Sequence, residues 1–191
     1  MRGGSSITIP FRAAALALVA ALVSLPPAGA QTAKGGPRMA FALRSPDFGD
    51  GADIPRAFTC SGEDRSPALE WSEVPEGTKS FALIADDPDA PAGTWVHWVI
   101  FNIPASARGL RVAVEKKEQL ADGTRQGKND FSRIGYNGPC PPPGKPHRYF
   151  FRLYALSCEL TLAPGASKAE VEKAMQSCTL GQAQWMGKFQ R

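Results

Sequence analysis

The chain has 191 residues, with 22 Lys and Arg against 18 Asp and Glu, a formal net charge of +4 and 43% hydrophobic residues. This length and apolar content suffice for one domain with a hydrophobic core. Basic and acidic residues are interspersed, as in "EKKEQ" at 115–119, and no basic stripe with interleaved aromatic residues occurs. The composition therefore argues against nucleic acid as a partner.

Residues 1–30 have the pattern of a secretory signal peptide. Arg2 and Arg12 supply the positive end, an uncharged apolar segment covers 13–25, and "AGA" at 28–30 matches an A-x-A cleavage site. The apolar segment is shorter than the about 20 residues that a membrane-spanning helix needs, and an uncleaved anchor is the alternative. We expect cleavage after Ala30 and a periplasmic or secreted protein.

A flexible leader, "QTAKGGPR" at 31–38, precedes a single domain at 39–191. Within this domain, segments rich in branched and aromatic residues alternate with clusters of Gly, Pro, Asp and Asn, which is typical of strands joined by turns. Strands and helices do not alternate regularly, so we expect a mainly β protein, an antiparallel Greek-key β-sandwich with a C-terminal helix. The predicted strands are 39–45, 68–72, 79–86, 94–104, 109–115 and 147–156.

One helix is indicated near the C-terminus. Ser167 stands three residues before Glu170, as in a capping box, and an apolar stripe follows at helical spacing. We expect this stripe to face the core. The segment "QAQWMGKF" at 182–189 is predicted to form a second, short helical piece. The stripe consists of Val171, Ala174, Met175 and Cys178.

The four cysteines are Cys60, Cys140, Cys158 and Cys178. An even number of cysteines in an exported chain indicates disulfides, with three connectivities open. No C-x-x-C pair is present, which argues against a zinc ribbon or a thioredoxin-type redox motif. The preferred pairing joins Cys60 to Cys140 and Cys158 to Cys178.

The two histidines, His97 and His147, each lie in a predicted strand that follows a proline-rich loop. In an extended strand His97 would share a face with Trp95 and Val99, and His147 with Tyr149. If each histidine is considered alone, its pattern is that of a hydrogen-bonded residue on a half-buried strand face rather than of a metal ligand or a catalyst. Together, they predict a shared pocket.

Such a pocket suits an oxyanion, because histidine, tyrosine and backbone N–H groups all donate hydrogen bonds. Asp87 and Asp89 would repel an anion unless they orient the histidines or receive a cationic group, so a zwitterionic headgroup would fit both halves. The alternative is that both aspartates are simply turn residues. Nearby carboxylates are expected to raise the histidine pKa values, so phosphate-type ligands should bind more weakly as the pH rises.

Three motifs and one upstream segment resemble the phosphatidylethanolamine-binding protein family, also called Raf kinase inhibitor-like proteins, and in particular its bacterial branch. They are "DPDAP" at 87–91, "HW" at 97–98, "GPCPPPGKPHRYFFRLYAL" at 138–156 and "SPALEWSEVP" at 66–75. The resemblance runs from about residue 40 to the C-terminus. It implies a Greek-key β-sandwich with a small cavity for phosphate-like anions and phospholipid headgroups. Carried over residue by residue, it implies a site of Asp87, Asp89, Pro91, His97, Cys140, Pro141, His147 and Tyr149.

The favoured function is therefore an exported binding protein for a small anionic or zwitterionic ligand, without a metal or cofactor. An alternative is an inhibitor that acts on a protease or another enzyme through its surface, since the family name includes inhibitors. An enzyme is less favoured. It would use Cys140 as nucleophile with His147 as base, or the two histidines and an aspartate as ligands for iron or zinc.

Overall fold

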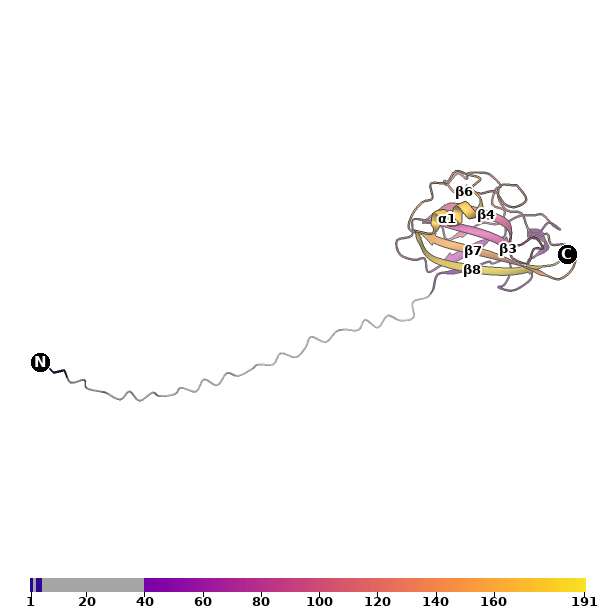
Figure 1. Cartoon of the computed structure of the whole chain (residues 1–191). Helices are drawn as coiled ribbons and strands as arrows, with labels where there is room; N and C mark the ends of the chain where they lie inside the picture. The colour runs from indigo at the N-terminus through magenta and orange to yellow at the C-terminus, as the bar shows by residue number, and fades with distance from the viewer. Residues whose placement is uncertain (2, 5–39) are drawn as a thin grey trace. The chain divides into compact units, whose positions relative to one another are not determined.

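The computed structural model describes residues 1, 3–4 and 40–191; apart from residues 1, 3 and 4, the expected signal peptide (1–30) and leader (31–38) lie outside this described part. No described helix is both long and apolar enough to span a membrane. The elements, labelled in Figure 1 where space allows, are β1 (Ala42–Arg44), a 3-10 turn η1 (Arg56–Phe58), β2 (Leu69–Ser72), β3 (Ser80–Asp87), β4 (Trp95–Pro104), β5 (Gly109–Leu110), β6 (Arg125–Gln126), β7 (His147–Leu156), α1 (Lys168–Met175) and β8 (Thr179–Phe189).

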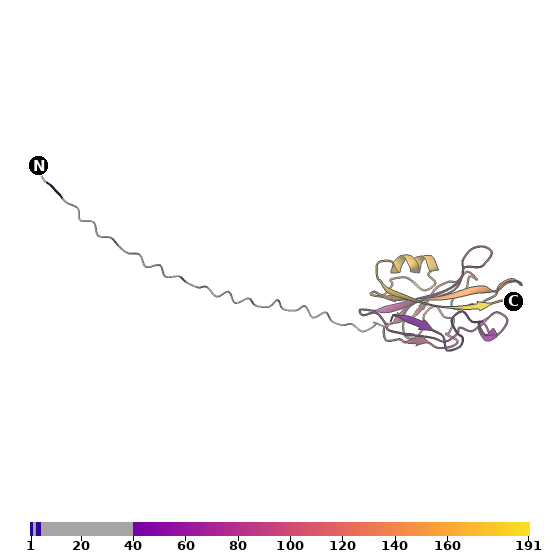
Figure 2. The same cartoon turned by 90° about the horizontal axis from the view of Figure 1, so that it is seen from below.

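The strands form two antiparallel sheets. The larger sheet has the order β6-β4-β3-β7-β8 and the smaller one the order β1-β2-β5. Figure 2 shows α1 on one side of the larger sheet and β1 of the smaller sheet on the other. The mainly β, antiparallel sandwich that the sequence predicts is therefore confirmed.

Strand β3 lies at the centre of the larger sheet, and all of its residues are buried. Phe81 and Leu83 belong to the core between the two sheets, whereas Ala82 and Ile84 belong to the core beneath α1. Because both faces of β3 are covered, its sequence reads as a continuous apolar run rather than as an alternating one.

Helix α1 starts where the sequence predicts. The Ser167 side chain accepts a hydrogen bond from the Glu170 backbone N–H, and the Glu170 carboxylate accepts one from the Ser167 N–H at 2.8 Å, which completes the capping box. Val171 and Met175 are buried against the larger sheet. The predicted helix and its apolar stripe are therefore confirmed, although Cys178 lies beyond the helix end.

The prediction of a second helical piece at 182–189 is wrong, because this segment belongs to strand β8. β8 pairs with β7 from His147–Phe189 to Leu156–Thr179, so ladder hydrogen bonds decide its conformation. Ala183 and Trp185 pack on the core between the sheets. Tertiary pairing has overridden a weak local preference.

Smaller differences concern the short strands. The predicted strands at 39–45 and 109–115 shorten to β1 and β5, and β6 was not predicted. β5 pairs with β2 through two residues only, and β6 also pairs with β4 through two residues. Two-residue strands are too short to show a period-two pattern in the sequence.

Two disulfides are present, with the preferred connectivity. Cys60 is bonded to Cys140 with a Cα–Cα distance of 5.4 Å, and Cys158 to Cys178 with a distance of 5.9 Å. The first ties the proline-rich loop to the segment after η1, and the second ties the end of β7 to the segment after α1. Among the described residues, which include all four cysteines, no thiol is free.

Candidate ligand-binding site

A cavity of about 350 Å³ lies where β3 ends and where β4 and β7 begin. Most of its wall is apolar, with a small set of convergent polar side chains, as in small-molecule sites. The lining residues are Asp87, Ala90, Pro91, Ala92, Trp95, His97, Phe131, Cys140, Pro141, Pro142, His147 and Tyr149.

Asp87 and His147 form a buried pair at the base of this cavity. Asp86 and Asp87 are neighbours at the end of β3, so they project to opposite faces of the sheet. The Asp87 Oδ2 atom lies 2.8 Å from His147 Nδ1, and Asp87 Oδ1 accepts the Asp89 backbone N–H at 2.8 Å. Because a carboxylate accepts hydrogen bonds, Nδ1 of His147 carries a proton, and Nε2 is the ring nitrogen left for a ligand.

His97 reaches the cavity through a β-bulge in β4. Ala85 of β3 pairs with Trp98 and Asp86 pairs with Val96, so His97 is the extra residue between two register positions. His97 and Trp95 both line the cavity, whereas Val99 packs beneath α1. The expected shared face of His97 and Val99 is therefore wrong, because the bulge breaks the alternation.

The His97 ring donates one hydrogen bond to a backbone carbonyl. Its Nδ1 lies 2.7 Å from the Asn137 oxygen. Burial lowers the pKa of His97, while the Asn137 carbonyl and the Asp87 charge oppose this shift. The expectation that carboxylates raise the pKa values of both histidines is therefore wrong for His97, because the loss of solvent outweighs the attraction.

Tyr149 brings a polar group that has no hydrogen-bond partner within residues 40–191. The residue is 2% exposed, and its hydroxyl is a buried polar group that forms no hydrogen bond with any described residue. Burial, followed by the Asp87 charge, raises the pKa of Tyr149, so the hydroxyl keeps its proton and can donate it. The ring meets His97 edge to face, with 5.2 Å between the ring centroids.

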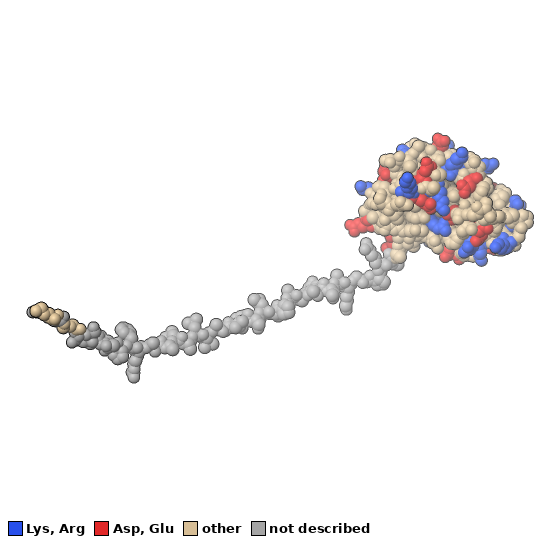
Figure 3. Space-filling view, viewed as in Figure 1, with Lys and Arg blue, Asp and Glu red and all other residues tan. Residues whose placement is uncertain are grey.

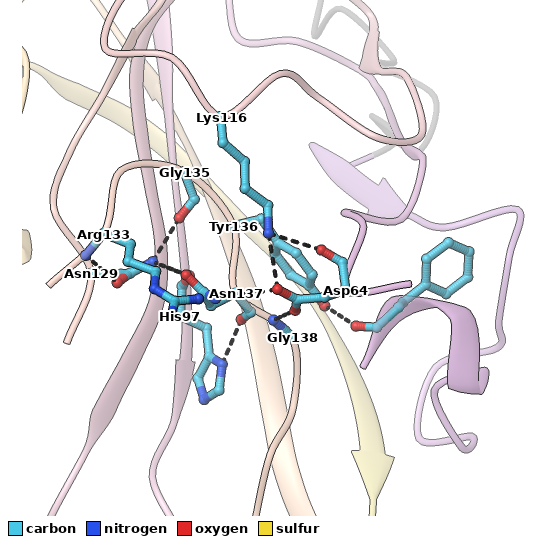
Figure 4. A network of polar contacts seen from close by, with 10 residues as sticks. Asp64, His97, Lys116, Asn129, Arg133, Gly135, Tyr136, Asn137 and Gly138 are labelled. Carbon is cyan, nitrogen blue, oxygen red and sulfur yellow. Dashed lines mark hydrogen bonds and ion pairs between the residues drawn. The ribbon is translucent and has the colours of Figure 1, made fainter. Parts of the chain in front are cut away.

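A network of polar contacts holds the segment that follows Ile134 (Figure 4). The Asp64 carboxylate accepts hydrogen bonds from the Gly138 backbone N–H at 2.6 Å and from the Asn137 side chain at 3.2 Å. Lys116 Nζ pairs with the same carboxylate at 2.9 Å. The Asn129 amide donates to Asn137 Oδ1 at 2.9 Å. These contacts fix the backbone carbonyl that the His97 ring faces.

The proline-rich loop forms the rim. Cys140, Pro141 and Pro142 line the cavity, and the disulfide to Cys60 anchors the loop. Proline fixes φ and donates no backbone hydrogen bond, so such a loop is stiff without needing a ladder partner. The loop therefore holds the cavity mouth in place.

Asp89 does not line the cavity. Its carboxylate accepts two hydrogen bonds from the Arg148 guanidinium, at 2.8 and 2.9 Å, and one from the Arg148 backbone N–H at 3.0 Å. The turn after Asp87 directs this side chain outward, so only Asp87 of the two predicted aspartates reaches the cavity.

The Asp89–Arg148 pair predicts a pH-dependent effect on stability. The Arg148 hydrogen bonds lower the pKa of Asp89 to about 2, from an ordinary value of 3.8. A lowered pKa in the folded state stabilises the fold above the ordinary value, and this contribution is lost as the pH falls toward about 2. Asp89→Asn should therefore lower the urea midpoint at neutral pH and lose this effect in strong acid.

Urea unfolding of wild type and variant across this pH range measures the effect. Glu76→Gln, which removes the charge of an exposed side chain elsewhere in the domain, is the control. An Asp89→Asn difference that stays constant down to the lowest pH would contradict the assignment.

Sequence reasoning placed Trp95 on the face of His97 but did not include it among the site residues, and it missed Phe131, the other aromatic wall of the cavity. Trp95 and Phe131 meet edge to face at 5.5 Å, and Phe131 also meets His97 at 5.3 Å. Trp95 stands two residues before His97, and the shared face of these two residues, expected from period-two alternation, agrees with their place in the cavity wall. Phe131 lies in a loop without such a signal, as Pro142, Ala90 and Ala92 also do.

A larger hollow of about 820 Å³ lies over the sheet β1-β2-β5, away from these groups. Its charged side chains include Arg44 and Glu70, which are exposed and paired with each other. Unlike the smaller cavity, it contains no buried polar group without a partner among the described residues. Perturbed, buried titratable groups mark the smaller cavity as the candidate site.

The family model described as phosphatidylethanolamine-binding protein matches residues 44–190. The chain belongs to the phosphatidylethanolamine-binding protein family. The family resemblance of the sequence motifs is thus confirmed, and the match covers the cavity residues described above.

Relatives in this family are similar over most of the domain. A UPF0098 protein of Methanothermobacter thermautotrophicus is 52% identical over 149 residues, which are 78% of this chain and 98% of the relative. A UPF0098 protein of Aquifex aeolicus is 51% identical over 149 residues, or 77% of this chain and 86% of the relative. The crystal structure of Escherichia coli YbcL, described as a new member of the mammalian PEBP family, matches with a TM-score of 0.75 and 35% identity. The matched region covers 80% of this chain and 99% of the YbcL chain.

Proposed function

We propose that this phosphatidylethanolamine-binding protein family member is an exported binding protein whose cavity takes a small phosphate-type anion, free or as a phospholipid headgroup. The observation that carries the proposal is the buried Tyr149 hydroxyl, which has no hydrogen-bond partner among the described residues and borders the cavity beside His147. A buried polar group without a partner is costly, so a ligand that accepts its hydrogen bond would relieve that cost.

The other cavity groups support an oxyanion ligand. His147 is oriented by Asp87 so that Nε2 is left for the ligand, and this nitrogen donates when the ring is protonated. Figure 3 shows Lys and Arg interspersed with Asp and Glu on the visible face, without a large patch of one sign. This surface favours recognition of a small ligand in the cavity over binding to a large polyanion.

In this proposal the protein binds its ligand and does not catalyse a reaction. The Cys140 sulfur is bonded to Cys60 and has no thiol to act as a nucleophile. Within residues 40–191, no group of three or more His, Cys, Asp or Glu side chains is arranged to hold a metal ion. Disulfides persist in oxidising compartments, so the oxidised cysteines support export together with the signal pattern at 1–30.

The direct test is Tyr149→Phe. Loss of a hydrogen bond to a charged ligand should lower the affinity for phosphorylethanolamine by about tenfold, measured by calorimetry. The variant should be as stable as wild type or more stable, because it removes a buried hydroxyl that lacks a partner.

Tyr154→Phe is the matched control. Tyr154 lies on the same strand but packs beneath α1, away from the cavity, so its loss should leave the affinity unchanged. Absence of saturable binding to wild type, or equal affinity of Tyr149→Phe and wild type, would refute the proposed site.

A further inference from the structure

The two disulfides differ in their access to solvent. Cys60 is exposed, and Cys140 is partly exposed at the cavity rim. Cys178 is 9% exposed and belongs to the core beneath α1, and Cys158 packs against this core. In thiol–disulfide exchange a thiolate attacks one sulfur directly, so access is one of the factors that set the rate. A reductant in solution therefore reaches the Cys60–Cys140 bond first.

A positive charge lies beside one sulfur of this bond. The Nη1 atom of Arg191 is 3.7 Å from Cys140 Sγ. A neighbouring cation stabilises the thiolate form of a cysteine, and the sulfur with the more stable thiolate is the better leaving group. The more exposed residue, Cys60, is then the one that is attacked, and Cys140 is the one that leaves.

The same bond fixes the cavity rim, which consists of Cys140, Pro141 and Pro142. In the described part of the chain, the backbone of 141–146 makes no hydrogen bond to another backbone group. Proline has no N–H to donate, so this segment lacks the ladder bonds that hold a strand. Opening of the disulfide therefore removes the cross-link that holds the rim in place.

We propose that the Cys60–Cys140 disulfide is a site of thiol–disulfide exchange with a dithiol reductant, and that its reduction releases the rim and lowers the ligand affinity of the cavity. The loss of affinity rests on the proposed anion-binding function, whereas the exchange and the release of the rim do not. A released rim no longer covers the ligand, so the loss is expected in the dissociation rate.

The exchange transfers two electrons and two protons. A thiolate of the dithiol attacks Cys60 Sγ, the S–S bond breaks, and its electron pair leaves with Cys140 Sγ as a thiolate. The second thiol of the reductant then attacks the reductant sulfur of the mixed disulfide and releases Cys60 as a thiolate. The two protons of the dithiol end on the two cysteines, so the protein disulfide is reduced and the dithiol is oxidised to a disulfide.

Limited reduction of the folded protein tests the exchange site without any ligand. The oxidised protein is incubated with dithiothreitol, free thiols are alkylated with iodoacetamide at intervals, and peptide mass spectrometry follows all four cysteines. Cys60 and Cys140 should be alkylated about tenfold or more faster than Cys158 and Cys178, which serve as the internal control. Equal rates, or faster reduction of the second disulfide, would overturn the proposal.

The same alkylation experiment distinguishes two sources of the dithiol. Reduced thioredoxin, a C-x-x-C protein, replaces dithiothreitol at the same dithiol concentration. Faster exchange with thioredoxin supports a protein reductant, and faster exchange with dithiothreitol supports a small one. No exchange with either would overturn the proposal.

Arg191→Gln tests the choice of the leaving sulfur. Loss of the cation should slow reduction of the Cys60–Cys140 bond severalfold and leave the other disulfide unchanged. Lys145→Gln is the matched control, because it removes an exposed cation of the proline-rich loop that forms no hydrogen bond with Cys140. Equal rates for the two variants would overturn the role of Arg191.

The double variant Cys60→Ser and Cys140→Ser reproduces the open rim. NMR resonances of the Trp95 indole and the His147 ring, which both line the cavity, should shift or broaden relative to the oxidised protein. The Trp71 indole in the smaller sheet should keep its resonance. Unchanged cavity resonances would overturn the release of the rim, with no ligand needed for the decision.

Calorimetric titration with phosphorylethanolamine tests the loss of affinity. The double variant at Cys60 and Cys140 should bind about tenfold more weakly than wild type, whereas Cys158→Ser with Cys178→Ser should keep the wild-type affinity. Equal affinity of all three proteins would overturn the link between rim and ligand. Absence of binding to wild type would overturn the anion site and this link together, while the alkylation rates still decide the exchange site.

Wild-type protein gives a second test that does not depend on the folding of a variant. Linkage is reciprocal, so if the oxidised form binds the ligand more tightly, the ligand must favour the oxidised form by the same factor. In a buffer of reduced and oxidised dithiothreitol, saturating phosphorylethanolamine should therefore lower the fraction of reduced Cys60 and Cys140. A fraction that does not change with ligand would overturn the coupling.

Discussion

Asp86→Ala is expected to lower the free energy of unfolding by about 3–5 kcal/mol, because it removes the buried counter-ion of Arg152 and the nearer of the two counter-ions of Lys168, whose other partner is Glu172 at 3.6 Å. The Asp86 side chain is 1% exposed and is paired with Arg152 Nη1 and with Lys168 Nζ. It joins β3 and β7 to the first residue of α1. Urea denaturation followed by circular dichroism measures the loss.

Glu70→Ala is the matched control for Asp86→Ala. Glu70 also pairs with an arginine across neighbouring strands, but its side chain is 44% exposed and that of Arg44 is 66% exposed. Exposed pairs contribute about 0–1 kcal/mol, so this variant should be nearly as stable as wild type. Equal losses for the two variants would show that burial of the Asp86 cluster contributes nothing.

Gly138→Ala is expected to cost about 2–4 kcal/mol of stability and to weaken anion binding, because a side chain has no room there. A Cβ at this position would lie 2.8 Å from the Thr59 Cα and would clash with the Phe58 carbonyl oxygen. The Gly138 N–H must then leave the Asp64 carboxylate, and the Asn137 carbonyl shifts relative to His97. Thermal unfolding and phosphorylethanolamine titration measure the two effects.

Gly49→Ala controls for the replacement of a glycine itself. Gly49 is exposed, and its added Cβ would meet only the Ala52 Cβ at 3.7 Å, an ordinary contact. This variant should keep wild-type stability and affinity. A Gly138→Ala protein that retained both would show that the loop can move without affecting the site.

The central strands could be predicted from sequence because their patterns are long. The segments at 79–86, 94–104 and 147–156 are apolar runs bounded by turn residues, and they became β3, β4 and β7 with small changes at the ends. Strand β8 could not be recognised in the same way, since its conformation depends on pairing with β7. Its residues Ala183 and Trp185 do alternate with polar residues, and this alternation was the only local pattern in the segment that indicated a strand.

For the site, the motifs found the polar groups but not their orientation. The sequence motif does not distinguish the roles of Asp87 and Asp89. The turn between them decides that Asp87 faces His147 and Asp89 faces Arg148. The partner of His97 is a backbone carbonyl 40 residues away, which no side-chain motif encodes. Asp64 lies even farther from the segment that it holds, 74 positions before Gly138.

The cavity is built at the ends of β3, β4 and β7, which are the three inner strands of the larger sheet. Edge strands can fray on their own, but an inner strand separates from both neighbours only when the sheet opens as a whole. A ligand that binds only the folded chain therefore raises the free energy of the largest, cooperative opening of the domain, by an amount that grows with the ratio of ligand concentration to Kd. Occupancy of the cavity and the free energy of opening the whole sheet are thus thermodynamically linked, while local opening at the edges is independent of the ligand.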